Sequence, residues 1–241
     1  MSAGFMDIFF LWAHRGASAS APENTMAAFR AAESAGADGI EFDVRLSRDG
    51  VPVVIHDDTV DRTTDGQGRV NRMSVSELQS LDAGRWFGSG FTGERLPTVE
   101  EVLLWAGEGL RLNLEIKDPD AGAPVLELLR SYPRSRALIS SFDHEILFRL
   151  RRADPLLPLA FLLDSPFWRL PLKKAAECGA ESLNPRQDRV SRAMIAASHR
   201  LGLAVTPYTV DDPGRLDDLL RLGVNGVFSN LPYEIVARRH R

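Results

Sequence analysis

The sequence contains a single cysteine, Cys178, among 241 residues. One cysteine cannot form a disulfide within the chain, so no disulfide framework stabilises this fold. An excess of basic residues is also missing, because 29 Lys and Arg stand against 33 Asp and Glu and the formal net charge is -4. Nucleic-acid binding depends on clusters of basic side chains, so this balance argues against a nucleic-acid partner.

Long apolar runs are absent as well. The apolar stretch near the start, Ile8 to Ala13, is far shorter than the roughly 20 residues of a membrane-spanning helix. No basic region precedes this stretch and no cleavage-like site follows it, as a secretion signal would require. We therefore expect a buried strand here and a soluble, cytoplasmic protein without a stable membrane anchor. The sequence leaves the oligomeric state open.

Apolar runs of strand length alternate with segments of helical period along the whole chain. The expected strands cover residues 8–13, 39–46, 111–116, 137–140, 159–163, 182–184, 204–208 and 226–229. Such alternation is typical of βαβ units with parallel strands, and eight units in a chain of this length favour a closed barrel. No glycine-rich dinucleotide loop follows any strand, which weakens the doubly wound alternative. We predict one α/β domain over residues 1–241, a (β/α)8 TIM barrel.

One segment, at about residues 57–100, interrupts this alternation after the second strand. It follows a short strand-like run, Val51 to Ile55, and contains helical stretches near residues 75–81 and 98–106. We interpret it as a small insertion on the mouth of the barrel. Before it, residues 24–36 are expected to form a helix with Asn24 as the N-cap. Gly36, Gly179 and Gly223 are expected to end helices in the left-handed conformation.

Two acidic side chains lie close together on the second predicted strand. Glu41 and Asp43 are two residues apart, so their side chains share one face of the strand. Both faces of a barrel strand are normally buried, and two buried carboxylates repel each other unless a positive charge lies between them. A divalent metal supplies that charge, and oxygen ligands favour Mg²⁺ or Ca²⁺ over zinc. Glu115, at the end of the third strand, would complete a three-carboxylate site.

Histidines and cations occupy similar positions. His14 and Arg15 end the first strand, and His56 follows the run that ends at Ile55. Lys117 shares a strand face with Glu115 and would add positive charge near a bound phosphate. The carboxyl ends of the strands are where barrel enzymes have their active sites.

Several motifs in this order and spacing resemble the glycerophosphodiester phosphodiesterase family over nearly the whole chain. They are His14-Arg15-Gly16, Pro22-Glu23-Asn24-Thr25, Glu41-Phe42-Asp43-Val44, Pro52-Val53-Val54-Ile55-His56-Asp57, Arg62-Thr63-Thr64-Asp65-Gly66, Leu96-Pro97-Thr98-Val99, Asn113-Leu114-Glu115-Ile116-Lys117 and Ser140-Ser141-Phe142. The resemblance implies a (β/α)8 barrel with a small insertion after strand two. It also implies metal-dependent hydrolysis of glycerophosphodiesters to sn-glycerol 3-phosphate and an alcohol such as choline, ethanolamine or glycerol.

The resemblance assigns roles to individual residues as well. It implies that Glu41, Asp43 and Glu115 bind the divalent metal.

His14 and His56 would be the general acid and base, and Arg15 and Lys117 would hold the phosphodiester. Which histidine is the acid stays open. The nucleophile is either a water or the neighbouring glycerol hydroxyl, which would give a cyclic phosphate.

The C-terminal half departs from the family pattern in places. Tyr208 stands where the family usually has Trp, and Asn225 and Asn230 stand where it usually has Asp. We expect these changes to affect substrate contacts and the closure of the barrel, and not metal binding or proton transfer.

Three aromatic residues are candidates for substrate contact. Trp86 lies on the insertion and would form a wall of the pocket. Phe167 follows the fifth strand and would border the pocket mouth, and Tyr208 would contact glycerol or phosphate. Simple packing against the barrel is the alternative for each.

Two other functions fit the sequence less well. A related phosphodiesterase acting on lysophospholipids would need a longer apolar groove. A non-catalytic barrel that binds phosphorylated ligands would be expected to lack one or more of His14, Glu41, Asp43, His56 and Glu115, and all of them are present.

Overall fold

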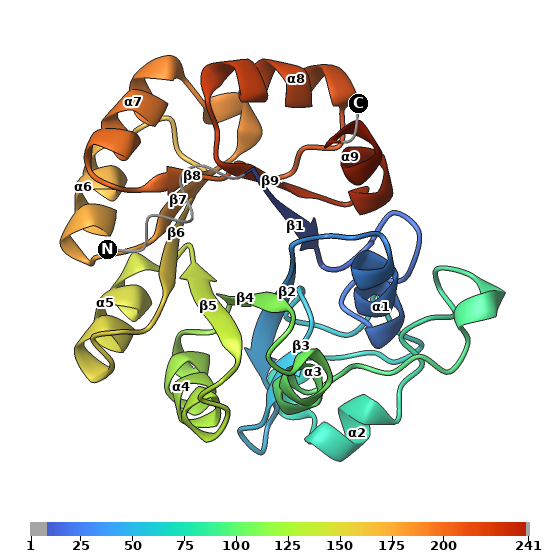
Figure 1. Ribbon diagram of the computed structural model, residues 1–241. Coiled ribbons are helices and arrows are strands. Elements are labelled where there is room, and N and C mark those ends of the chain that lie inside the picture. Colours follow the sequence, from blue (N-terminus) through green and yellow to red (C-terminus); the bar gives the residue numbers. More distant parts are fainter. Residues whose placement is uncertain (1–8, 240–241) are drawn as a thin grey trace.

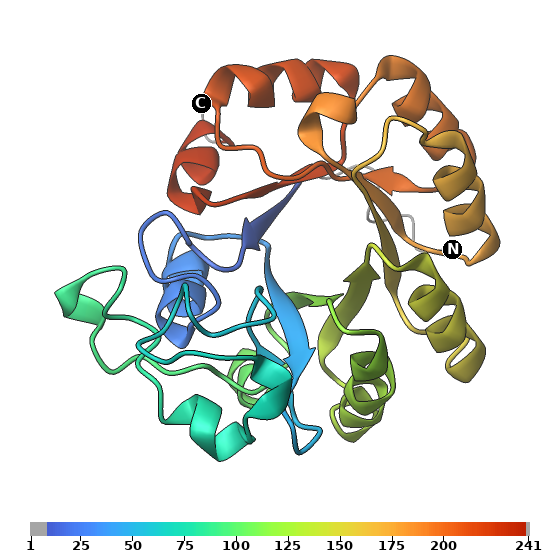
Figure 2. The ribbon, with the colours of Figure 1, turned by 180° about the vertical axis from the view of Figure 1, so that it is seen from behind.

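The computed structural model describes residues 9–239. Its strands form the inner wall of a barrel and its helices lie around them (Figure 1), an arrangement that Figure 2 shows from the opposite side. The strands are β1 Phe10–His14, β2 Gly39–Leu46, β3 Pro52–Val54, β4 Arg111–Ile116, β5 Arg136–Ser141, β6 Leu159–Leu163, β7 Ser182–Pro185, β8 Ala204–Val205 and β9 Gly226–Ser229. All the expected strands are present within these residues, while Ile8 lies outside them.

The helices follow the strands in chain order. The α-helices are α1 Met26–Ser34, α2 Val75–Gln79, α3 Val99–Ala106, α4 Gly122–Ser131, α5 His144–Ala153, α6 Arg169–Glu177, α7 Arg192–Arg200, α8 Pro213–Leu222 and α9 Pro232–Arg239. The short 3₁₀ helices are η1 Val70–Arg72, η2 Ser89–Phe91, η3 Pro119–Ala121 and η4 Gln187–Arg189. The helix ends at Gly36, Gly179 and Gly223 were predicted correctly, since φ is positive at each of these glycines.

The sheet is a nearly closed barrel of eight parallel strands, in the order β8-β7-β6-β5-β4-β2-β1-β9, with β3 antiparallel on β2. The two ends of this order are joined by backbone hydrogen bonds. Asn225 N donates to Val205 O at 2.9 Å, and Val210 N donates to Phe228 O at 2.8 Å. The predicted TIM-barrel fold is confirmed. The strand expected at 204–208 is shorter, because the ladder with β7 covers only Ala204 and Val205.

The core has two layers. Apolar residues on the outer faces of the strands pack against the helices, as Phe42 does against Phe29 of α1, with ring centroids 5.7 Å apart. Inside the barrel, Trp12 stacks on Phe228 with centroids 5.9 Å apart. Gly39 makes room for this indole, because a Cβ atom at Gly39 would lie 2.5 Å from Trp12. His14 is two residues beyond Trp12 on β1, so it faces the same interior.

The cap predicted for α1 was wrong. Thr25 is the N-cap, and its hydroxyl accepts a hydrogen bond from the backbone N–H of Ala28. Asn24 instead adopts a positive φ of 58°. This turn directs the Asn24 amide to Asp43, to whose Oδ2 its Nδ2 donates at 2.8 Å. A short polar side chain tolerates this conformation, and here it brings the amide to a buried carboxylate.

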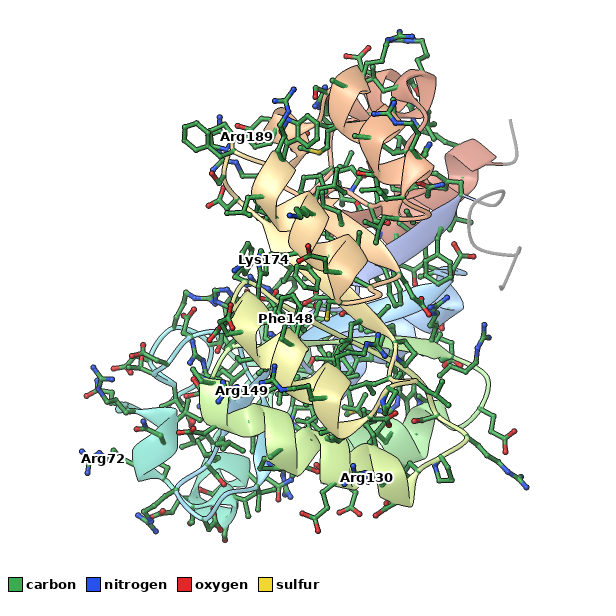
Figure 3. All side chains as sticks on the ribbon, turned by 90° about the vertical axis from the view of Figure 1, so that its left-hand side faces the viewer. Arg72, Arg130, Phe148, Arg149, Lys174 and Arg189 are labelled. Carbon is green, nitrogen blue, oxygen red and sulfur yellow. The ribbon has the colours of Figure 1, made fainter. Side chains whose placement is uncertain are left out.

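Residues between β3 and α3 form the excursion that the sequence places after the second strand. A separate apolar cluster stabilises this segment, with Val60, Val70 and Leu78 packed on Val53 and Ile55 near β3. In the side view, Arg72 of the excursion lies at the left-hand end of the barrel, and Arg189 of η4 lies toward that same end (Figure 3).

Candidate active site

Strand register brings the three predicted carboxylates together. His14 on β1 is aligned with Glu41 on β2, and Asp43 on β2 is aligned with Glu115 on β4. Oxygen atoms of Glu41, Asp43 and Glu115 all lie within 4.8 Å of one another. The three side chains are buried at the carboxyl ends of their strands.

Two cationic side chains pair with this acidic cluster. Arg15 Nε lies 3.1 Å from Asp43 Oδ2, and Lys117 Nζ lies 3.0 Å from Asp43 Oδ1 and also contacts Glu115. Glu41 receives a hydrogen bond from the backbone N–H of Arg15 at 3.0 Å. Within residues 9–239, its other oxygen, Oε1, has no hydrogen-bond partner. Two positive side chains do not balance three carboxylates.

The pKa values of the carboxyl groups reflect this imbalance. Burial, together with the neighbouring Asp43, raises the pKa of Glu41 to about 8 and that of Glu115 to about 7. Burial alone would also raise the pKa of Asp43, but Lys117 and then Arg15 hold it well below its usual value. The side chains around Glu41 and Glu115 therefore do not stabilise negative charge on these two groups.

The cluster has the chemistry of a site for a hard divalent cation. Its donors are carboxylate oxygens from two adjacent strands, the ligand type that Mg²⁺ and Ca²⁺ favour. The unpartnered Oε1 of Glu41 and the raised carboxyl pKa values are features that a bound cation would relieve. Glu41, Asp43 and Glu115 could thus hold a metal.

His14 lies at the edge of the cluster. Its Nε2 is 4.0 Å from Glu41 Oε2, and its Nδ1 is 2.7 Å from Asn230 Oδ1. The Asn230 amide nitrogen donates to Asp211 Oδ2 at 2.6 Å, which orients the amide oxygen toward His14. The Nδ1 of His14 is therefore the donor, and Nε2 has the free lone pair in the neutral ring. Burial and then the neighbouring Arg15 guanidinium lower the pKa of His14 below 6.5.

The C-terminal asparagines were expected to affect substrate contacts and the closure of the barrel. Asn225 does serve closure, since its side-chain oxygen accepts a hydrogen bond from Val205 N at 2.8 Å. Asn230 contacts His14 directly. Sequence reasoning missed this because residues 216 positions apart become neighbours only when β9 pairs with β1.

His56 approaches the same space from the loop after β3. Its Nδ1 lies 2.7 Å from Asp57 Oδ1, and Asp57 Oδ2 accepts from Arg62 Nε at 2.6 Å. Arg62, first of all, and then His56 hold the pKa of Asp57 down to about 2, so this carboxylate is ionised. Burial lowers the pKa of His56, although Asp43 and Asp57 act in the opposite direction.

A cavity of about 250 Å³ joins these groups. It is lined by His14, Arg15, Glu41, His56, Glu115, Lys117, Ser140, Phe142, Leu162, Asp164, Arg186, Tyr208, Thr209 and Phe228. Both candidate histidines and both candidate phosphate-binding cations thus face one space. Tyr208 is also part of its wall, with its ring edge-on to Phe142 at 5.8 Å.

Two of the predicted substrate contacts lie elsewhere. Trp86 does not line this cavity. Its indole packs edge-on against Phe87 on the excursion, and its Nε1 donates to Ala83 O at 2.9 Å. Phe167, 82% exposed on the loop before α6, also lies outside the lining. The geometry gives no support to a substrate contact from either residue.

Membrane insertion through a helix finds no support in the structure. None of the helices within residues 9–239 is both long enough and apolar enough to cross a bilayer.

Comparisons with known proteins agree on one family. The model of the glycerophosphoryl diester phosphodiesterase family matches residues 14–234. A glycerophosphodiester phosphodiesterase of Caldanaerobacter subterraneus is 37% identical over 231 residues, which cover 93% of this chain and 95% of that protein. A Bacillus subtilis glycerophosphodiester phosphodiesterase is 32% identical, with 91% and 83% covered.

Solved structures give the same result. A phosphodiesterase of Oleispira antarctica, in complex with the product sn-glycerol-3-phosphate, superposes with a TM-score of 0.90 at 30% identity, covering 97% of this chain and 98% of that one. A glycerophosphodiester phosphodiesterase of Agrobacterium tumefaciens superposes with a TM-score of 0.84 at 33% identity, covering 95% and 100%. The chain therefore belongs to the glycerophosphoryl diester phosphodiesterase family and is an enzyme of that class.

Proposed function

We propose that this protein hydrolyses glycerophosphodiesters to sn-glycerol 3-phosphate and an alcohol, with a divalent cation held by Glu41, Asp43 and Glu115. The observation that supports this most is the convergence of an under-compensated carboxylate cluster and two histidines on one cavity. The complex of the Oleispira antarctica relative with sn-glycerol-3-phosphate supports the product. A bound Mg²⁺ or Ca²⁺ would offset the phosphate charge and stabilise the charge that builds up in the transition state.

Arg15 and Lys117 are proposed to hold the phosphodiester. Both line the cavity, and both are only about one-sixth exposed, at 18% and 14% of the side chain. Their charges act at short range in a largely buried site, where electrostatic stabilisation is strong. Lys117 contacts two of the carboxylates, and its flexible stem lets the ammonium turn toward a bound phosphate.

The two histidines are proposed to exchange protons with the two oxygens that enter and leave phosphorus. His14 has a neutral amide as its Nδ1 partner and a free lone pair on Nε2, which suits a base. His56 has an ionised carboxylate as its partner, which stabilises an imidazolium and suits an acid. His14 accepts the proton of the attacking oxygen as the new P–O bond forms. His56 donates its proton to the alcohol oxygen as the old P–O bond breaks.

In the first step, the direction of proton transfer is the same for either nucleophile. If water attacks, glycerol 3-phosphate is released directly. If the neighbouring glycerol hydroxyl attacks, a cyclic phosphate forms first and water opens it with the histidines in exchanged roles.

The size and lining of the cavity favour small, water-soluble diesters over lysophospholipids. Its apolar wall is short and consists of Phe142, Leu162 and Phe228 beside Tyr208. An acyl chain would need a longer apolar groove.

The experiment is a release assay on a panel of substrates. Purified protein with Mg²⁺ or Ca²⁺ is expected to release glycerol 3-phosphate from glycerophosphocholine, glycerophosphoethanolamine and glycerophosphoglycerol. Faster turnover of lysophosphatidylcholine would contradict the proposal, and no turnover of any diester with any cation would contradict it outright.

A further inference from the structure

A series of hydrogen bonds connects the two sides of the cavity through a residue outside it. His56 Nδ1 contacts Asp57 Oδ1 at 2.7 Å, and Asp57 Oδ2 accepts from Arg62 Nε at 2.6 Å. Arg62 also donates from Nη1 to Glu23 Oε2 at 2.8 Å and from Nη2 to Glu23 Oε1 at 2.9 Å. Glu23 Oε1 in turn accepts from Arg15 Nη1 at 2.9 Å. Arg62 does not line the cavity.

We propose that Arg62 is a positioning residue that fixes His56 through Asp57 and Arg15 through Glu23. The inference rests on the proposed function, since it assigns Arg62 to the geometry of that reaction. The proposal also gives a reason for the excursion after β3. This segment supplies Arg62, which joins Glu23 in the loop after β1 to Asp57 beside His56.

The shape of the guanidinium explains why an arginine is needed. Its edge with Nη1 and Nη2 grips both oxygens of Glu23, while Nε is directed at Asp57. A planar fork matches a carboxylate in this bidentate manner, whereas an ammonium is a single point of charge. A lysine at position 62 can therefore reach one carboxylate well but cannot hold both in their present orientation.

Stabilisation of the fold does not explain why Arg62 pairs with both carboxylates. The Arg62 side chain is 45% exposed, and partly exposed ion pairs contribute little to the free energy of unfolding. Orientation is more sensitive, because a small displacement of a catalytic group has a large effect on rate. Loss of Arg62 lets the Asp57 carboxylate rotate, so His56 loses the partner that fixes its ring and its tautomer. It also releases Glu23, which otherwise restrains Arg15.

The same excursion offers a matched control. Arg69 pairs with Asp58 at 3.1 Å, and both side chains are more than half exposed. Like the Arg62 pairs, this pair joins an arginine of the excursion to a carboxylate, and Arg69 does not line the cavity. Arg69→Gln therefore removes a surface ion pair of the excursion without touching the connection between His56 and Arg15.

The test compares Arg62→Gln, Arg62→Lys and Arg69→Gln in the full chain, with saturating Mg²⁺ or Ca²⁺ and glycerophosphocholine as substrate. Arg62→Gln is expected to lower kcat by about tenfold to a hundredfold, with KM changed less than kcat. Arg62→Lys is expected to recover only part of the loss, and Arg69→Gln is expected to retain the wild-type rate. Tm is expected to stay within about 4 °C of wild type in all three, and the rise of Tm with added cation is expected to be unchanged.

A double-mutant cycle with Asp57→Asn tests the connection itself. Because Arg62 is proposed to act through Asp57 as well as through Glu23, the double variant is expected to lose less activity than the product of the two single losses. Multiplicative losses would overturn the proposal, as would a kcat for Arg62→Gln equal to that of Arg69→Gln. A loss of activity that parallels a loss of folded protein would also overturn it, by showing a purely structural role.

A spectroscopic measurement separates this inference from the proposed function. Nitrogen-15 NMR of the imidazole side chains is expected to show one fixed tautomer for neutral His56 in wild-type protein, with the proton on Nδ1, and a mixture in Arg62→Gln. This result holds whatever substrate the enzyme prefers. The same fixed tautomer in both proteins would overturn the positioning role, while fixed geometry without turnover of any glycerophosphodiester would contradict the proposed function instead.

Discussion

Asn230 accepts a hydrogen bond from Nδ1 of His14 at 2.7 Å. The backbone N–H and the side-chain nitrogen of Asn230 both donate to the Asp211 carboxylate, which fixes the Asn230 amide. A neutral amide thus occupies the position in which many catalytic histidines have a carboxylate. The amide sets the tautomer of His14 without placing a full negative charge beside it. Burial and then Arg15 lower the pKa of His14 below 6.5, although the hydrogen bond to Asn230 acts in the opposite direction.

Asn230→Ala is expected to lower kcat by about tenfold to a hundredfold, because His14 loses the acceptor that fixes its ring and its tautomer. Steady-state kinetics on glycerophosphocholine measures the loss.

Asn230→Asp is a second variant at this position, and it tests the effect of charge beside His14. It keeps an acceptor and adds negative charge, which favours the protonated imidazole and raises the pKa of His14. The acidic limb of the pH profile of kcat/KM is therefore expected to move to higher pH, since His14 has to be neutral to act as a base. A wild-type rate in Asn230→Ala would show that the contact is dispensable.

Cation binding is expected to depend on pH. The pKa values of Glu41 and Glu115, raised to about 8 and about 7, mean that both groups retain protons near neutral pH unless a cation displaces them. Ligand carboxylates have to be ionised, so the rise in Tm with saturating Mg²⁺ or Ca²⁺ is expected to grow from about pH 6 to about pH 9. Thermal melts with NaCl at equal ionic strength are the control.

The stability of the cation-free protein is expected to change with pH in the opposite direction. The pKa of Glu41 is about 8 in the folded protein and 4.5 in the unfolded chain. Its protonated form therefore contributes stability that is fully present below pH 4.5 and is lost as the pH rises through about 8. The stability of the cation-free protein is therefore expected to fall over this range. A flat profile with cation and without it would argue against the crowding of these carboxylates.

The loss of rate in a His56 variant is expected to depend on the leaving group of the substrate. If His56 protonates the departing alcohol, His56→Gln lowers the rate with glycerophosphocholine by about 10²- to 10⁴-fold. The loss is expected to be much smaller for a glycerophosphodiester of p-nitrophenol, whose oxygen leaves without a proton. Initial rates on both substrates measure the ratio, with His14→Gln as the matched variant that loses rate on both. Equal losses on both substrates for His56→Gln would assign it another role.

Gly39→Ala is expected to destabilise the protein by about 1–3 kcal/mol. The new Cβ atom would lie 2.5 Å from the Trp12 ring and 2.9 Å from Arg111 O, so the indole has to move. Trp12 stacks on Phe228, which lines the cavity, and a loss of activity should accompany the loss of stability. Gly109→Ala is the control, because nothing lies within 4 Å of a Cβ atom there. Urea unfolding of the two variants makes the comparison.

Most of the fold followed from local pattern. Strands such as β6, whose residues are all buried, are apolar throughout, and alternation with helices then implied parallel strands. The cap of α1 was misplaced by one residue because Asn24 and Thr25 are both good caps, and only the tertiary contact of Asn24 with Asp43 decides between them.

The site was predictable to a similar degree. Period-two spacing placed Glu41 beside Asp43 on one strand face, and the ends of other predicted strands added His14, Arg15, Glu115 and Lys117. The supporting contacts were not predictable, because Asn230 reaches His14 only across the closure of the barrel and Arg62 reaches Glu23 only through the path of the excursion. Phe167 and Trp86 were chosen for their aromatic character, yet neither lines the cavity.

The most direct test of the central claim is glycerol 3-phosphate release from glycerophosphocholine by protein stripped with a chelator, before and after Mg²⁺ or Ca²⁺ is returned. If Glu41, Asp43 and Glu115 hold a cation that the reaction needs, stripping abolishes turnover, the returned cation restores it, and Glu41→Gln stays inactive at any cation concentration. Turnover that survives complete removal of the cation, or that Glu41→Gln retains, would contradict the claim.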